Sequence, residues 1–134
     1  MKSRPFVAAV LALLCACSAT DTTDAGVKLV SGNYQLSTVN GQPLPFTESS
    51  TTPVTKLTGS KLVVRIDGTF TETSTRSMTT PTGTTTTSDV STGTFSVGGQ
   101  VVSFISSGTF NGLGSYNITL SIPVNSEQRL YVRE

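Results

Sequence analysis

Apolar and polar residues alternate with a period of two along most of the chain after residue 27, and turn-forming residues separate the alternating stretches. Such alternation is typical of antiparallel strands that bury one face. It is clearest over residues 115–122, which predict one strand that ends at Pro123 and carries on one side Tyr116, Ile118, Leu120 and Ile122. No stretch after residue 27 shows a convincing helical period. We therefore expect an all-β domain of about seven strands in hairpin sequence.

A hairpin is predicted where Gly98 and Gly99 separate two alternating stretches, because a Gly-Gly pair accepts the positive φ angles of a two-residue turn. This turn pairs Val97 with Gln100 and Phe95 with Val102. It places on one face, which must then be buried, the side chains of Phe95, Val97, Val102 and Phe104.

A second hairpin contains an Asp-Gly turn within residues 66–68, and its loop length follows from the strand register. A two-residue loop mixes polar and apolar side chains on both faces of the hairpin. A three-residue loop pairs Val64 with Phe70 and keeps the apolar side chains together. The same register carries Glu72 onto the inner face, opposite Leu62. Unless a bulge intervenes, the inner face continues with Ser74, Arg76 and Met78.

The other segments complete a chain of hairpins. A first strand begins near Tyr34 and turns at the Asn-Gly pair 40–41, after which three prolines make residues 42–53 a loop or an edge strand. The low-complexity residues 79–88 are expected to form a long polar loop, and residues 129–133 a final strand. Closing such strands on themselves removes exposed edges. The predicted fold is therefore an antiparallel up-and-down β-barrel, with a two-sheet β-sandwich as the alternative.

The N-terminal segment has a different pattern, in which Lys2 and Arg4 precede an apolar run over residues 6–14 and then small residues. This is the layout of a secretory signal peptide. The run is shorter than the roughly 20 apolar residues that cross a bilayer as a helix. Cleavage of an ordinary signal peptide after Ala16 or Ala19 is one interpretation of this segment.

A second interpretation follows from the four residues that end at Cys17 and read Leu-Cys-Ala-Cys. They resemble a bacterial lipobox, and the resemblance implies that residues 1–16 are removed and that Cys17 becomes a lipidated membrane anchor. Ser18 stands where an Asp would retain a lipoprotein at the inner membrane, which implies the outer membrane. On this interpretation residues 17–28 are a flexible tether and residues 29–134 are the barrel domain.

Charge and composition exclude several classes of function. The chain has nine basic and eight acidic side chains, and the loss of Lys2 and Arg4 leaves seven basic against eight acidic. With no basic stripe, we expect no nucleic-acid binding. The absence of histidine excludes Ser-His-Asp and Cys-His catalysis and histidine-ligated metal sites, and one retained cysteine permits no internal disulfide. The sequence predicts a monomer that is not an enzyme and holds no cofactor or metal.

Three short segments carry a resemblance to a known group: residues 32–36 (Gly-Asn-Tyr-Gln-Leu), 39–45 (Val-Asn-Gly-Gln-Pro-Leu-Pro) and 67–70 (Asp-Gly-Thr-Phe). With them, the domain resembles the small lipocalin-like lipoproteins of Gram-negative bacteria. True lipocalins have a tryptophan in the first strand that an arginine from the last strand covers. Tyr34 stands at the place of that tryptophan, and Arg129 or Arg133 is expected to cover it.

These observations leave three hypotheses for function. The first is a small apolar ligand held by Glu72 in a cavity lined by Tyr34, Leu36, Phe70, Phe95, Phe104 and Tyr116. Alternatively, Glu72 is a residue of the barrel mouth, either solvated or paired with Arg76 or Lys61. The second hypothesis is an interaction or inhibitor module of the cell envelope, with residues 42–58 and 79–88 as its binding loops. The third is a structural surface lipoprotein without a specific ligand.

Overall fold

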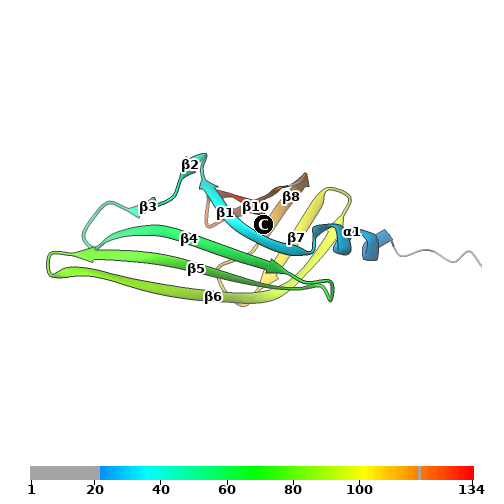
Figure 1. Ribbon diagram of the computed structural model, residues 1–134, viewed down its shortest axis with the longest axis horizontal. Coiled ribbons are helices and arrows are strands. Elements are labelled where there is room, and N and C mark those ends of the chain that lie inside the picture. The colour runs from blue at the N-terminus through cyan, green and yellow to red at the C-terminus, as the bar shows by residue number, and fades with distance from the viewer. Residues whose placement is uncertain (1–21, 118) are drawn as a thin grey trace, which may run out of the picture.

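The computed structural model describes residues 22–117 and 119–134 (Figure 1). The elements of this part are α1 (Thr22–Val30), β1 (Gly32–Val39), β2 (Gln42–Pro43), β3 (Phe46–Ser49), β4 (Val54–Val64), β5 (Thr69–Thr80), β6 (Gly83–Gly98), β7 (Val101–Ser106), β8 (Gly112–Asn117), β9 (Thr119–Val124) and β10 (Glu127–Arg133). The predicted signal peptide and Cys17 lie outside the described residues. Within these ranges, no helix has the length and apolar character needed to cross a membrane.

The strands form one antiparallel sheet that closes on itself. Its order is β2-β1-β10-β9-β8-β7-β6-β5-β4-β3, and β1 also pairs with β4. This pairing runs from Gly32 opposite Val64 to Gln35 opposite Lys61, and it closes β1 and β4 to β10 into an eight-stranded barrel. The protein is therefore an all-β, up-and-down, lipocalin-like barrel, as predicted, and the β-sandwich alternative is wrong.

The Asp-Gly hairpin between β4 and β5 has the predicted register. Val64 pairs with Phe70 and Leu62 with Glu72. Gly68 adopts a φ of 80°, the left-handed conformation that a three-residue loop requires at this position. Glu72 consequently lies on the inner face, where it is buried.

The hairpin between β6 and β7 turns one residue later than predicted. Gly98 pairs with Val101, so that Gly99 and Gln100 form the turn and Phe95 lies opposite Phe104 instead of Val102. Gly99 has a φ of 64°, and a turn with glycine at its first central position needs only this one positive φ. The predicted face is nevertheless correct, because the shift moves each partner by two residues and so preserves the alternation.

The stretch 115–122, predicted as one strand, belongs to two strands. β8 and β9 pair with each other, and Tyr116 lies opposite Leu120. Residues that pair across a hairpin point to the same face, so the alternation continues unbroken through this reversal of the chain. Ile118, between the two strands, lies outside the described residues. Pro123 is a residue of β9, which ends one residue later at Val124.

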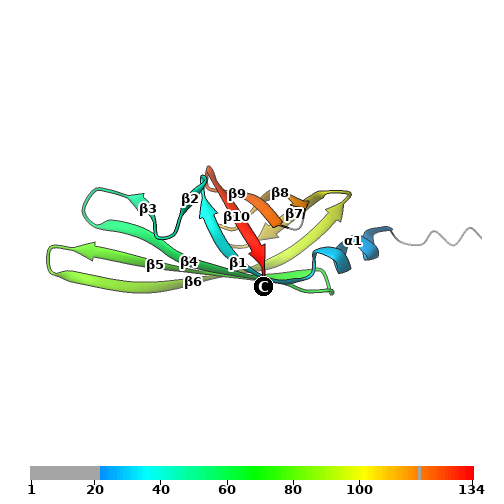
Figure 2. The same ribbon diagram turned by 45° about the horizontal axis from the view of Figure 1, so that its top comes forward.

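Residues 79–88, predicted to be a long loop, are instead the tip of a β-hairpin. β5 and β6 stay paired from Thr69 opposite Thr94 to Thr80 opposite Gly83. We call residues 75–90 the arm, because this end of the hairpin extends past the barrel together with the adjoining part of β4, which pairs with β5 as far as Val54 opposite Thr79 (Figures 1 and 2). Threonine is β-branched and favours strands, so a polar threonine run forms a ladder where no apolar face is needed.

Of two further segments, residues 42–53 agree with the prediction and residues 22–28 differ from it. Residues 42–53 contain β2 and β3, which pair with β1 and β4 as edge strands. Residues 22–28, expected to be part of a flexible tether, lie in α1. The helix joins the barrel through Val30, which is fully buried and whose carbonyl accepts a 2.5 Å hydrogen bond from the Tyr34 hydroxyl. The ordered domain therefore begins before residue 29.

Candidate functional site

The residues predicted to line a ligand cavity meet inside the barrel, but they pack against one another. Tyr34, Leu36, Phe70, Phe95 and Phe104 are buried, and Tyr116 is partly buried against the same core. The Phe70 and Phe104 rings meet edge to face with centroids 5.1 Å apart, and the Phe95 ring stacks on Phe104 at 6.0 Å. These distances are those of aromatic rings in contact.

Phe110, which the sequence reasoning missed, completes this packing. It lies between β7 and β8, is 1% exposed, and has its ring centroid 5.4 Å from Phe70 and 6.0 Å from Tyr131. Asn111 holds the segment, because its side-chain oxygen accepts a 2.6 Å hydrogen bond from the Ser106 N–H. No alternation surrounds Phe110, so no periodic signal marked it as a core residue.

Tyr34 and Arg133 form the contact expected from the lipocalin resemblance. The guanidinium carbon of Arg133 lies 5.8 Å from the centre of the Tyr34 ring, and the same guanidinium donates hydrogen bonds to the carbonyls of Leu29 and Ser31. Burial raises the pKa of Tyr34 to about 12. Of the two candidate arginines, Arg133 is therefore the one that covers Tyr34.

Glu72 lies deep in the barrel at 2% exposure. Its carboxylate accepts a 2.5 Å hydrogen bond from Ser60 Oγ, which lies 2.9 Å from the Tyr131 hydroxyl. Its ion pair is with Arg129, whose Nη1 is 3.8 Å away. Burial raises the pKa of Glu72, against the opposing effects of Ser60 and Arg129.

The mouth-residue interpretation of Glu72 is therefore wrong. The carboxylate is not solvated, and the partners named for it lie elsewhere. Lys61 pairs with Glu134 at 3.2 Å on the exposed surface, and Arg76 pairs with Glu48 and Asp89.

Arg129 is the centre of the buried charges, with a side chain only 3% exposed. It lies 3.0 Å from Glu127 and 3.8 Å from Glu48 as well as near Glu72. We call the set of connected charges the ionic network, which consists of Glu48, Glu72, Arg76, Asp89, Glu127 and Arg129. The members come from β3, β5, β6 and β10, so their convergence depends on the closed barrel and not on any local motif.

The ionic network is satisfied internally. Arg76 Nε lies 2.8 Å from Glu48 and its Nη1 lies 3.0 Å from Asp89 and from Ser74 Oγ. Within the described ranges, every buried side-chain nitrogen or oxygen has a hydrogen-bond partner. In the same ranges no cluster of three or more His, Cys, Asp or Glu is arranged to hold a metal ion. The network thus has the character of a structural element that runs from buried Glu72 and Arg129 to exposed Asp89, since its polar atoms already have protein partners.

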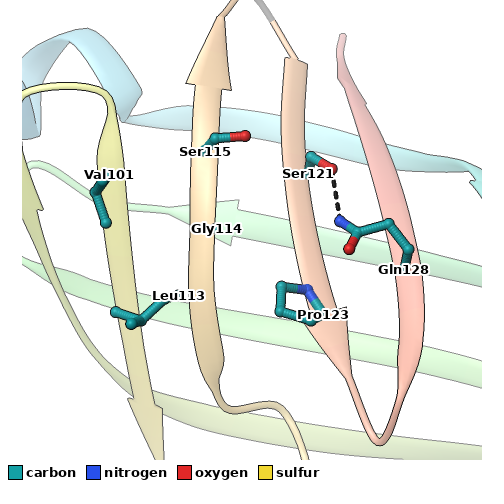
Figure 3. A pocket seen from close by; sticks show the side chains of 7 residues that line it. All are labelled: Val101, Leu113, Gly114, Ser115, Ser121, Pro123 and Gln128. Carbon is teal, nitrogen blue, oxygen red and sulfur yellow. Dashed lines mark hydrogen bonds between the residues drawn. The ribbon is translucent and has the colours of Figure 1, made fainter.

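Three hollows along the described residues lie outside the apolar core. Figure 3 shows one of about 510 Å³ on the outer face of β7 to β10, where Val101 and Leu113 lie near each other and Gln128 Nε2 donates a 2.6 Å hydrogen bond to Ser121 Oγ. None of its lining residues is ionisable. Two others, of about 410 and 390 Å³, lie along residues 42–47 and at the base of the arm. None of the three is lined by a residue of the buried core.

The arm presents the second candidate site. Every residue of β6 from Gly83 to Val90 is exposed, and Val90 is 62% exposed. The two strands of the arm are joined by hydroxyl contacts as well as by the backbone, with Thr79 and Thr84 at 2.9 Å and Thr75 and Ser88 at 3.3 Å. The arm is therefore an ordered, polar projection on a rigid barrel.

No family model, curated protein or solved structure matches this chain. The class of protein is therefore defined by its geometry: a small lipocalin-like β-barrel with a packed interior, an ionic network that reaches from the interior to the surface, and a projecting arm.

Proposed function

We propose that this chain is a lipid-anchored lipoprotein of the bacterial outer membrane whose barrel acts as a protein-interaction module of the cell envelope. The anchor is Cys17, and the binding surface is the arm. The observation that carries the proposal is the arm itself, because it extends from a closed barrel a stretch of β6, residues 83–90, in which every residue is exposed. Exposed strands on a rigid scaffold bind extended segments of other chains through their backbone groups.

The interior of the barrel favours this function over the small-ligand hypothesis. A pocket for a small molecule has a volume of roughly 300–1,000 Å³ and apolar walls. Here the apolar side chains that would form such walls contact one another, and Phe110 fills the space between Phe70, Phe104 and Tyr131. Glu72, the expected polar anchor, has its hydrogen bond from Ser60 and its cation in Arg129.

Two experiments on the full-length chain in its own envelope test the proposal. A photoreactive amino acid at Ser88 on the arm should form a covalent adduct with a protein, whereas the same probe at Ser115 on the outer barrel wall should not. Mass spectrometry of the mature N-terminus should find Cys17 acylated. An unmodified Cys17, or adducts that are no more abundant from Ser88 than from Ser115, would contradict the proposal.

A ligand titration separates the two hypotheses. Fluorescent fatty acids or retinoids should show no saturable binding to the wild-type chain. Saturable binding that Glu72→Ala abolishes would favour the small-ligand hypothesis instead.

A further inference from the structure

The outer edge of β6 has no strand partner along the arm. One side of β6 pairs with β5 over the whole length of the hairpin. The other side pairs with β7 only from Gly93 to Gly98. Within the described ranges, residues 84–90 of β6 therefore form a sheet edge that no strand covers.

The register shows which backbone groups face this edge. Thr80 and Gly83 close a two-residue turn, and such closing residues exchange hydrogen bonds with each other. From Gly83 onward, the N–H and C=O groups of every second residue then bond to β5. The backbone groups of the intervening residues point away from β5, toward the open edge. The Gly98 and Val101 pair that closes the next hairpin gives the same alternation from the other end of β6. The N–H and C=O groups that face the open edge are those of Thr84, Thr86, Ser88 and Val90.

Apart from one charged residue, this edge lacks the features that normally prevent strand pairing. Native edges are blunted by lysine, proline or a bulge. Residues 84–90 contain no proline and no basic residue, and the β5–β6 ladder runs through them without a register shift. Asp89 is the one charged residue of the segment.

We infer that the edge of β6 binds the same edge of a second copy of this chain in an antiparallel, two-fold symmetric pair. This inference rests on the proposed function, because it names the partner that the arm binds. The register that uses all four outward-facing residues pairs Thr84 with the second copy's Val90 and Thr86 with its Ser88. The two-fold axis then passes beside Thr87, which lies opposite its own counterpart.

The charge and side-chain composition of the edge favour a second copy as the occupant. In this register Asp89 lies opposite the second copy's Thr85, so that no like charges face each other. The other pairs join threonine, serine and valine, which are favourable across antiparallel strands. The arm already contains contacts of this kind between its own strands, such as that of Thr79 with Thr84 at 2.9 Å.

The arm also gives the second copy room to bind beyond its base, where Gly108 and Thr109 line a hollow with Val90. It extends past the end of the barrel in both views (Figures 1 and 2), and β3 and β4 lie on the β5 side of the hairpin. An antiparallel pair places the two barrels at opposite ends of the joined arms. The expected state is therefore a dimer, in place of the monomer that the sequence predicted.

Cysteine cross-linking in the full-length chain tests this register. Thr87→Cys should form a disulfide-linked dimer on mild oxidation in the envelope, because directly opposed residues of a non-hydrogen-bonded pair lie about 4.5 Å apart between Cα atoms. Thr82→Cys at the tip of the same arm is also exposed but lies far from its counterpart, so it should give no dimer. The wild-type chain controls for its native cysteines.

Two edge variants then distinguish backbone pairing from chance contact. Added to Thr87→Cys, Thr86→Pro should abolish the cross-link because it removes an outward N–H, whereas Thr86→Ala retains the N–H and should leave the cross-link intact. Ser88→Pro serves as a second disrupting variant, and circular dichroism verifies that each variant folds.

The outcomes separate the inference from the proposed function. A disulfide dimer that depends on residue 87 and on the edge N–H groups supports the second copy. An adduct of Thr87→Cys with a different protein overturns the inference and leaves the proposed function standing. Absence of any adduct from Thr87→Cys overturns the inference, and the photoreactive probe at Ser88 then decides the proposed function separately.

Discussion

Replacing Arg129 with leucine should destabilise the barrel strongly, because Arg129 is the cation at the centre of the ionic network. Its side chain is 3% exposed and lies within 4 Å of three carboxylates, those of Glu48, Glu72 and Glu127. Leucine removes the positive charge and leaves Glu72, itself buried, without an ion pair. The variant therefore tests whether the buried charges hold one another in place.

The magnitude follows from the cost of an uncompensated buried charge. Removing one partner of a buried ion pair lowers the free energy of unfolding by about 3–5 kcal/mol. For a domain of this size, 1 kcal/mol corresponds to about 4 °C in Tm, so the expected loss is about 12–20 °C. Most of the loss should disappear at a pH low enough to protonate the carboxylates, because the charges that Arg129 compensates are then absent.

Thermal and urea denaturation followed by circular dichroism at pH 7 measure this loss. Arg133→Leu is the matched control, since Arg133 belongs to the same strand but lies over Tyr34 at the surface, and it should cost about 1 kcal/mol. Adding Glu72→Gln to Arg129→Leu should recover part of the lost stability. A loss for Arg129→Leu no larger than that of the control, or no recovery in the double variant, would refute the reasoning.

Three further changes test other parts of the structure. Burial raises the pKa of Glu72 above 4.5, so the folded state binds this proton more tightly than the unfolded chain and wild-type stability falls as the pH rises past that value. As the pH rises from 4.5 to 7, Glu72→Gln should therefore gain stability relative to the wild type, as measured by urea denaturation. A difference in stability that stays constant or changes in the opposite direction would contradict this prediction. Phe110→Ala should lower the free energy of unfolding by about 3–5 kcal/mol and leave an internal cavity; a loss below about 1 kcal/mol would mean that the ring does not fill the core. Gly93→Ala should cost about 1–3 kcal/mol because its Cβ would overlap the Ile105 carbonyl, whereas Gly98→Ala meets no neighbour within 4 Å and should be close to neutral in the same assay.

The sequence determined the position of Glu72 because register is strongly constrained where one face is buried. Only the three-residue loop at residues 66–68 kept Val64 and Phe70 on one face, and the same choice placed Glu72 inside. The prediction of register therefore placed Glu72 correctly on the inner face, although it identified neither the depth of its burial nor the partner of the carboxylate.

The sequence does not identify that partner, because alternation shows which face of a strand a residue is on but not how far along the barrel axis it lies. Arg129 and Arg133 are four residues apart on β10 and so share the inward parity. Arg133 pairs with Tyr34 where β1 begins, while Arg129 pairs with Val39 at the other end of the same strand. Only the three-dimensional register assigns one arginine to the ring and the other to the ionic network.

The arm was missed for a different reason. A strand that projects beyond a barrel has no buried face, so the threonine run of residues 84–87 lacks the apolar alternation by which strands are recognised. Its β-branched side chains favour a strand, but its polar, low-complexity composition predicts a loop. Phe110 is the opposite case. It is an isolated aromatic residue between β7 and β8 that is buried in the core although no apolar alternation surrounds it.

The ionic network and the arm are parts of one arrangement. Asp89 and Arg76 lie at the base of the arm and join β6 to β5, and the contact of Arg76 with Glu48 at 2.8 Å ties β3 to the same place. Glu48 also lies 3.8 Å from Arg129, which connects these surface charges to the buried part of the ionic network. The base of the arm is therefore fixed to the packed interior. An edge held in this way loses less conformational entropy on pairing than a mobile loop would, because most of its ordering has already occurred on folding.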